Sequence, residues 1–283
     1  MRMRLFNTGY TFQEKLSIFL LKVINRIILR LNKNGLLANY ISEINQLKKS
    51  GFQCERSKQN VLQISKNELN YVLRPYTSDY RVFNQVYIDE EYKPLLEIIK
   101  QLNFNKPLKI IDAGSNIGLF SHWISQNVEI DRVVSIEADT ENFHFQKIYY
   151  SAKYKTILKL ALWGYSNKKL TLGSSFRGGE HWAKSIVQGD KEKGNEVNSI
   201  TLNDIYKQYF ENEEIDILKI DVEGAEANIF AETNSYDVIL KKTKILALEI
   251  HDEFKCRENI YNLLTNNGFT ILDIGETTFA YKK

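Results

Sequence analysis

The chain has few of the residues that mark disulfide frameworks or zinc sites. Among its 283 residues are only two cysteines, Cys54 and Cys256, which form neither a CxxC pair nor a Cys/His spacing. This excludes a disulfide framework and gives no sign of a zinc site. A reducing cytoplasm is therefore the expected location.

An unbroken apolar run long enough to cross a membrane is also lacking. Residues 15–31 are the most apolar stretch near the N-terminus, but Lys22, Asn25, Arg26 and Arg30 interrupt them, and no signal-peptide cleavage pattern follows. Their apolar residues recur every three or four positions, which predicts a basic amphipathic helix. We favour packing of this helix on the body of the protein or on a second subunit. Attachment to the inner face of an anionic membrane is the alternative.

Charge of one sign is concentrated only at the N-terminus. The net charge is +3, yet the first fifty residues carry nine basic and two acidic side chains, which leaves 29 basic against 33 acidic in the remainder. The body is therefore acidic, and no stripe of alternating basic and aromatic residues runs through it. We expect no nucleic-acid partner.

From residue 106 onward, apolar strand patterns alternate with helical ones, which predicts an α/β domain with a mostly parallel sheet. The predicted strands are 108–111, 132–136, 156–161, 215–220 and 244–250, and the predicted helices are 116–126, 140–152, 202–209, 225–232 and 257–267. Residues 269–283 read as an antiparallel hairpin at the sheet edge, and residues 173–196 as a long loop. We expect an N-terminal helical extension over residues 1–60 and one domain over residues 61–283.

A glycine turn joins the first strand of this series to its helix, in the segment LKIIDAGSNIGLF. Gly114 and Gly118 permit a tight turn and close approach of a ligand to the backbone. Glu137 ends the next strand about twenty residues later, where an acid accepts hydrogen bonds from the ribose hydroxyls of an adenosine ligand. Asp112 would repel a pyrophosphate but suits an amino group and a sulfonium. The turn therefore favours S-adenosylmethionine over a dinucleotide.

The ordered segments DAGSNIGLF, SIEAD, LKLALWGYSNKKLTL, DILKIDVEGAEANIF and LALEIH resemble the FkbM-type family of S-adenosylmethionine-dependent methyltransferases. The resemblance runs from about residue 72 to the C-terminus, roughly three-quarters of the chain. It implies a Rossmann-like sheet of seven strands in the order 3-2-1-4-5-7-6, with the last strand antiparallel. It also implies O-methylation of hydroxyls on sugars or related metabolites.

The resemblance further implies a set of cofactor-binding positions. Asp112, Gly114, Asn116 and Gly118 would surround the methionine moiety, Glu137 would bind the ribose, Ala161 and Leu162 would lie near the adenine, and Asp79 would close the site from the N-terminal side.

The strand order would bring the acidic run after residue 220 next to the segment LEIHDEF. Asp221 would then face the cofactor, with Glu223 and His251 beside it. A hydroxyl is a poor nucleophile, and His251 is our candidate for its general base because an unperturbed histidine titrates near neutral pH. The alternative is a divalent cation such as Mg²⁺ held by Asp221, Glu223 and Asp252. We expect Glu226 to serve only the start of a helix.

The acceptor is the least defined part of this interpretation. The loop over residues 173–196 holds Arg177, His181 and Trp182, which suit a wall for a sugar or glycan acceptor. The leading hypothesis is an S-adenosylmethionine-dependent O-methyltransferase. The alternatives are an NAD-dependent oxidoreductase and a non-catalytic protein of the same fold that docks through its basic N-terminal helix.

Overall fold

The computed structural model describes residues 9–24, 36–172, 186–187 and 196–283. They group into two compact units, Met1–Phe83 and Asn84–Lys283. The dividing point lies after the boundary expected at residue 60, because the first three strands and the helix that follows them contact one another more than the rest of the chain.

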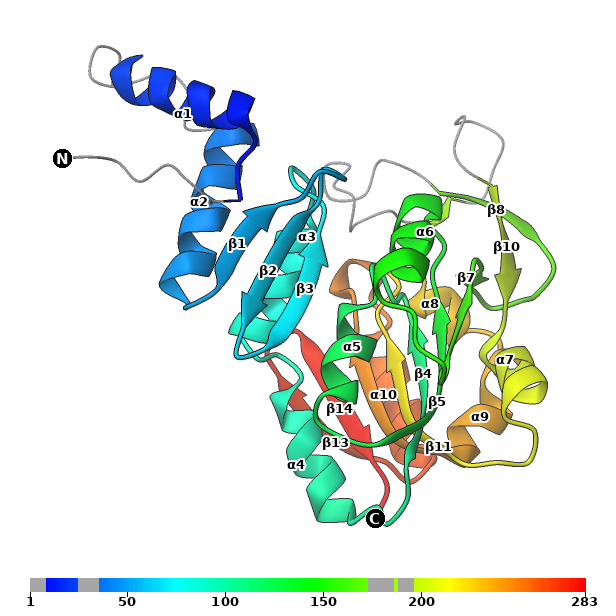
Figure 1. The fold of residues 1–283 in the computed structure, drawn as a ribbon. Helices are drawn as coiled ribbons and strands as arrows, with labels where there is room; N and C mark the ends of the chain where they lie inside the picture. Colours follow the sequence, from blue (N-terminus) through cyan, green and yellow to red (C-terminus); the bar gives the residue numbers. More distant parts are fainter. Residues whose placement is uncertain (1–8, 25–35, 173–185, 188–195) are drawn as a thin grey trace. The chain divides into compact units, whose positions relative to one another are not determined.

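The N-terminal unit contains helices α1 (Phe12–Ile24) and α2 (Leu36–Lys49), strands β1 (Gln53–Arg56), β2 (Leu62–Lys66) and β3 (Leu69–Leu73), and the short helix α3 (Asp79–Phe83) (Figure 1). The strands form an antiparallel sheet in the order β1-β2-β3. Phe52, Tyr71 and Phe83 pack edge to face in its core, with ring centroids 5.1–6.2 Å apart. Strand β1 lies at one edge of this sheet, and only one of its four side chains, Cys54, is buried.

Helix α1 confirms a helix within residues 15–31 only as far as Ile24, because residues 25–35 lie outside the described part of the chain. Its side chains at Phe12, Leu16, Phe19 and Leu20 are about half exposed or more. One apolar face of α1 is therefore open to solvent. No helix among the described residues is long and apolar enough to cross a membrane.

A seven-stranded sheet forms the centre of the C-terminal unit, in the order β13-β14-β12-β11-β4-β5-β6. Its strands are β4 (Leu108–Ala113), β5 (Ile130–Ile136), β6 (Lys155–Leu158), β11 (Ile215–Ile220), β12 (Thr243–Glu249), β13 (Thr270–Ile274) and β14 (Thr277–Tyr281). Only β14 runs antiparallel to its two neighbours. Numbered along the chain within this sheet, the order is 3-2-1-4-5-7-6, which confirms the predicted fold.

The helical segments of this unit are η1 (Asn84–Ile88), α4 (Lys93–Leu102), α5 (Leu119–Ser125), α6 (Thr140–Tyr149), α7 (Leu202–Tyr209), α8 (Glu226–Ile229), η3 (Thr233–Ser235), α9 (Asp237–Lys242), η4 (Asp252–Phe254) and α10 (Arg257–Asn266). After α3, the chain continues directly into the π-helix η1. Strand β11 is buried along its whole length, and β4 is buried at five of its six residues. The two strands that carry the candidate site are thus the best anchored.

A second sheet, in the order β7-β10-β8-β9, replaces the end of the predicted strand 156–161. It consists of β7 (Ala161–Leu162), β8 (Lys169–Leu172), β9 (Ile186–Val187) and β10 (Glu196–Ile200). The chain leaves the main sheet after Leu158, and β7 pairs in parallel with β10. This puts Ala161 and Leu162, the two residues of β7, outside the main sheet, where they line a pocket together with Gly114 and Glu137.

Candidate active site

The turn after β4 needs glycine because two strands approach each other closely there. Gly114 has φ of +71°, and a Cβ at this position would lie 1.6 Å from the carbonyl oxygen of Asp221. The backbone N–H groups of Gly114 and Ser115 both donate to the Ile136 oxygen at 3.0 Å. The glycine therefore lets β4 and β11 meet at the edge of a pocket.

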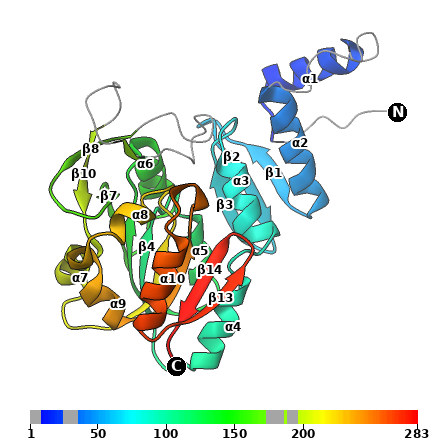
Figure 2. The same ribbon diagram turned by 180° about the vertical axis from the view of Figure 1, so that it is seen from behind.

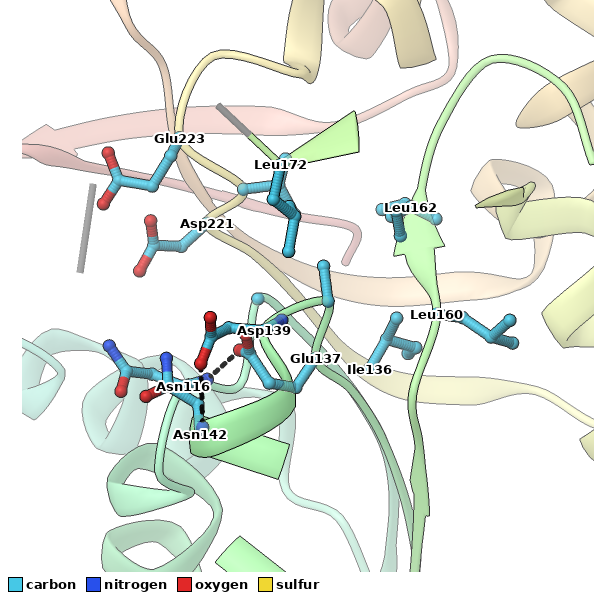
Figure 3. A pocket seen from close by; sticks show the side chains of 14 residues that line it. Asn116, Ile136, Glu137, Asp139, Asn142, Leu160, Leu162, Leu172, Asp221 and Glu223 are labelled. Carbon is cyan, nitrogen blue, oxygen red and sulfur yellow. Dashed lines mark hydrogen bonds between the residues drawn. The ribbon is translucent and has the colours of Figure 1, made fainter. Parts of the chain in front are cut away.

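Glu137 stands at the opposite side of this turn, directly after β5. Its Oε2 accepts a hydrogen bond from the Asn116 N–H at 2.7 Å, and its Oε1 accepts one from the Asp139 N–H at 2.7 Å (Figure 3). Burial raises the pKa of Glu137 to about 7, and the Asp139 carboxylate adds to the rise, although the two N–H groups oppose it. Each oxygen keeps acceptor capacity for a ligand hydroxyl.

The pocket between these elements contains about 620 Å³ of space free of atoms, part of it open to solvent. In the view of Figure 3, Asp221 and Glu223 lie on one side and Leu160 and Leu162 on the other. The lining residues are Gly114, Asn116, Ile136, Glu137, Ala138, Asp139, Asn142, Leu160, Ala161, Leu162, Leu172, Asp221, Val222 and Glu223. A polar end and an apolar end thus share one cavity.

Lys219, on β11, holds the residues at the polar end of the pocket in place. Its ammonium donates to the Gly114 oxygen at 2.8 Å and to Asp221 Oδ2 at 3.3 Å, and lies 3.7 Å from Asp112 Oδ1. Burial would lower the pKa of Lys219, but Asp221 and Asp112 raise it above its usual value. One buried cation therefore joins the glycine turn to the acid that faces it.

His251, after β12, lies among three carboxylates. Its Nδ1 is 3.1 Å from Glu226 Oε1, while its Nε2 is 3.3 Å from Glu223 Oε2 and 3.5 Å from Glu249 Oε1. Burial would lower the pKa of His251, but the hydrogen bonds to Glu223 and Glu226 raise it well above its usual value. This raised pKa contradicts the near-neutral pKa expected of an unperturbed histidine. Carboxylates face both ring nitrogens of His251, and this arrangement favours its charged form.

Glu249 belongs to the same cluster and can share a proton with His251. Burial raises the pKa of Glu249 far above its usual range, and the negative charge of Asp221 raises it further, while the His251 cation opposes the rise. Among the members of this cluster, only Glu223 lines the pocket. It has φ of +51° and precedes Gly224, with φ of +93°, so the backbone bends sharply to present it.

Glu226 had been expected only to begin a helix, and the structure corrects this. It is the first residue of α8, but its side chain is fully buried and bound to His251 rather than exposed at the helix start. Lys219 and Glu249 were also not assigned a role from the sequence. Their positions in the buried strands β11 and β12 were recognisable, but a charged residue in a buried strand indicates only that some partner exists.

The other predicted cofactor residues lie in varied places. Asp112 is fully buried below the pocket, where it accepts a hydrogen bond from Ser121. Gly118 begins α5, with φ of +93°. Asp79 belongs to the N-terminal unit, where Arg74 binds both of its carboxylate oxygens, at 2.6 and 3.0 Å. Their contact with a cofactor stays a prediction.

The expected acceptor wall of Arg177, His181 and Trp182 lies outside the described residues. Among the three ligands of the divalent-cation alternative, Asp252 is bound by Arg257, which contacts both of its oxygens at 2.6 and 3.0 Å. Within the described ranges, no group of three or more His, Cys, Asp or Glu side chains has the arrangement of a metal site. The divalent-cation alternative therefore gains no support.

Several solved structures are similar to the chain in fold. Methyltransferase FkbM from Methylobacillus flagellatus KT is 12% identical over 96% of this chain and 72% of its own, with a TM-score of 0.44. The METTL16 MTase domain is 13% identical over 89% and 82%, with a TM-score of 0.45. Magnesium protoporphyrin IX methyltransferase from Synechocystis PCC 6803 with bound SAM is 14% identical over 73% and 83%, with a TM-score of 0.40. Such distant likenesses say nothing about the substrate.

No curated protein matches the chain in sequence. The model of the methyltransferase FkbM domain, however, matches residues 112–271, which is more than half of the chain and includes the glycine turn, Glu137, Asp221, Glu223 and the His251 cluster. The chain belongs to the FkbM methyltransferase domain family.

Proposed function

We propose that the protein is an S-adenosylmethionine-dependent O-methyltransferase that acts on a hydroxyl of a sugar, a glycan or a related metabolite. The observation that carries the proposal is the pocket in which the Glu137 carboxylate and the Asp221 carboxylate face one cavity across the glycine turn. The apolar end formed by Leu160, Ala161 and Leu162 suits an adenine, and Glu137 suits a ribose.

The donor set at the other end fits the charged part of this cofactor. Asp221 Oδ1 is buried without a hydrogen-bond partner among the described residues, which leaves an acceptor for an ammonium group. The negative charge also favours a sulfonium. When bound there, S-adenosylmethionine supplies an electrophilic methyl group.

The chain's own residues supply the proton chemistry. We infer that Glu223 accepts the proton of the acceptor hydroxyl, because it lines the pocket and lies 3.3 Å from His251 Nε2. Glu226 holds the opposite ring nitrogen, and Glu249 shares the proton of the cluster. His251 thus acts as a charged orienting group, not as the free base expected from an unperturbed histidine.

The experiment that tests the proposal combines cofactor binding with product identification. Calorimetry would measure binding of S-adenosylhomocysteine and of reduced nicotinamide dinucleotide to the full chain. Mass spectrometry would compare native glycans from the source cells with those of a strain that lacks the gene. Binding of the dinucleotide in place of S-adenosylhomocysteine, or glycan masses that do not change by a methyl group, would contradict the proposal.

A further inference from the structure

A second cavity lies in the C-terminal unit, between α4 and the β13–β14 hairpin. Figure 2 shows α4 beside these two strands. The groove contains about 1470 Å³ of space free of atoms, including the part open to solvent. Apolar side chains line it at Ile98, Leu272, Ile274 and Tyr281, and Leu272 and Ile274 are each 41% exposed. Exposed branched side chains of this kind are costly to leave in water and suit a ligand.

Carboxylates dominate the polar part of the same groove. Asp89, Glu90, Glu91, Glu97 and Glu276 line it, and Lys93 is the one basic side chain among its described lining residues. Lys93 lies 2.6 Å from Glu90 and neutralises that carboxylate. The remaining acids give the groove a negative potential, which repels anionic ligands and attracts cationic ones.

Glu91 connects the groove to the reacting centre. The Thr277 hydroxyl donates a hydrogen bond to Glu91, and Thr277 pairs with Glu249 in the ladder between β12 and β14. Burial raises the pKa of Glu91, and the charge of Asp221 contributes to the rise. Glu91 therefore lies within electrostatic reach of the carboxylate that faces the cofactor pocket.

We propose that this groove binds the part of the acceptor that extends beyond the reacting hydroxyl, and that it selects sugars with amino groups or no charge over sugars with carboxylate or phosphate groups. The proposal rests on the proposed function, because it extends the acceptor site of that same reaction. Glu91 and Glu276 would bind hydroxyl or ammonium groups near the cluster, and Leu272, Ile274 and Tyr281 would pack on ring faces farther along.

The test measures binding of three oligosaccharides of equal length to the full chain saturated with S-adenosylhomocysteine. They are oligomers of glucosamine, of glucose and of galacturonic acid, which are cationic, neutral and anionic in that order. We expect the glucosamine oligomer to bind about tenfold or more tightly than the galacturonic acid oligomer, with glucose between them. Added salt should reduce this difference, because Asp89, Glu97 and Glu276 are exposed.

Variants locate the effect. The double change Glu97→Gln and Glu276→Gln is expected to weaken binding of the glucosamine oligomer about fivefold or more, and to leave glucose binding within about twofold. The matched control is Glu258→Gln, an exposed acid on α10 that does not line the groove. This control should change none of the three affinities.

Three results would overturn the proposal. They are equal binding of the amino and acidic oligomers, unchanged affinities in the double variant, and no binding of any of the three. A chain that still binds S-adenosylhomocysteine and methylates native glycans would then keep its proposed function, so the two failures are distinguishable. If Leu272→Ser and Ile274→Ser lower the mass of the protein in light scattering but leave sugar binding unchanged, the groove is an interface between two copies.

Discussion

Lys219 is a single buried cation that compensates two acids of the candidate site. Its ammonium lies within 3.3 Å of Asp221 and 3.7 Å of Asp112, and it also donates to the glycine turn. Asp112 is fully buried and Lys219 is 4% exposed. A buried charge that loses its partner is costly, so each of these groups depends on the others.

We therefore expect Lys219→Met to lower the free energy of unfolding by about 3–5 kcal/mol and to abolish binding of S-adenosylhomocysteine. Urea denaturation and calorimetry would measure the two effects. The control is Lys169→Met, whose ammonium pairs with Glu196 on the surface and is 73% exposed, and it should change neither quantity. Intact cofactor binding in Lys219→Met would show that the glycine turn does not need this cation.

Glu137 offers a prediction about pH. Its pKa is raised to about 7, and a ligand whose hydroxyls donate to the carboxylate binds its ionised form. We expect the affinity for S-adenosylhomocysteine to rise from pH 5 to 7 and to level off above pH 7. Glu137→Gln should remove this dependence and weaken binding at pH 8 about tenfold or more.

The comparison for this prediction is Glu141→Gln, an exposed acid in the first turn of α6. At each pH, the affinity of this variant for S-adenosylhomocysteine should equal that of the unaltered protein. A Glu137→Gln protein that keeps the pH dependence would assign the titration to another group of the pocket.

The His251 cluster predicts a second dependence on pH, in the rate. The pKa of Glu249 is raised to about 9, so its carboxyl proton is lost as the pH rises through about 9. Because the cluster accepts the hydroxyl proton more readily once that proton has left, we expect kcat to increase above pH 7. In Glu249→Gln the increase should vanish. A profile that levels off near pH 6.5 would instead indicate a histidine of ordinary pKa as the base.

Among the elements, the turn between β4 and α5 is the most constrained. Gly114→Ala would place a Cβ 1.6 Å from the Asp221 oxygen, so β4 and β11 would have to separate. Gly268 has a similar φ of +82°, but a Cβ there meets nothing within 4 Å. We expect Gly268→Ala to cost about 1 kcal/mol of stability through its backbone conformation alone, and Gly114→Ala to cost several times more and to abolish S-adenosylhomocysteine binding. Equal costs in thermal unfolding would contradict the close approach.

Elements with a strong local pattern were predictable from the sequence. Helix α7 begins and ends as predicted, because Thr201 caps it through the Asp204 N–H and its buried side chains follow a helical repeat. Strand β11 was also predicted at its observed ends, as a short apolar run between polar residues. The strand order came from the family resemblance rather than from local pattern.

Features that depend on distant pairing were not predictable in this way. Strand β7 lies outside the main sheet and pairs with β10, nearly forty residues later. No pattern within residues 156–162 predicts that the chain leaves the main sheet there. Glu226 and His251 are 25 residues apart and meet only because β11 and β12 are neighbours. By contrast, Gly114, Glu137 and Asp221 were predictable as pocket residues. Each lies in a turn or at the end of a strand.

At the scale of the whole molecule, the two units differ in charge. Residues 84–283 carry 30 acidic and 24 basic side chains, whereas residues 1–83 carry five acidic and 14 basic. Every residue that lines the pocket, and the whole His251 cluster, belongs to the acidic unit. The exposed apolar face of α1 belongs to the basic unit. Cofactor binding and the contacts of α1 are therefore expected to be separable.

This separation predicts that a fragment of residues 84–283 binds S-adenosylhomocysteine within about threefold of the full chain, as measured by calorimetry. A fragment that is folded by circular dichroism but binds more than about tenfold more weakly would instead support closure of the site by Asp79. A change of Phe12 and Phe19 to Ser in the full chain serves as a comparison, and it should leave cofactor binding unchanged while altering only the oligomeric mass or binding to anionic vesicles.

The carboxylates around the pocket also affect what happens after transfer. Glu137, Asp139, Asp221 and Glu223 line a cavity whose polar end contains one buried ammonium, that of Lys219. In the proposed reaction, methyl transfer would leave a neutral thioether in place of a sulfonium, so the attraction between the pocket and its occupant would fall. We expect S-adenosylhomocysteine to dissociate and S-adenosylmethionine to replace it. The enzyme should therefore resist inhibition by its own product.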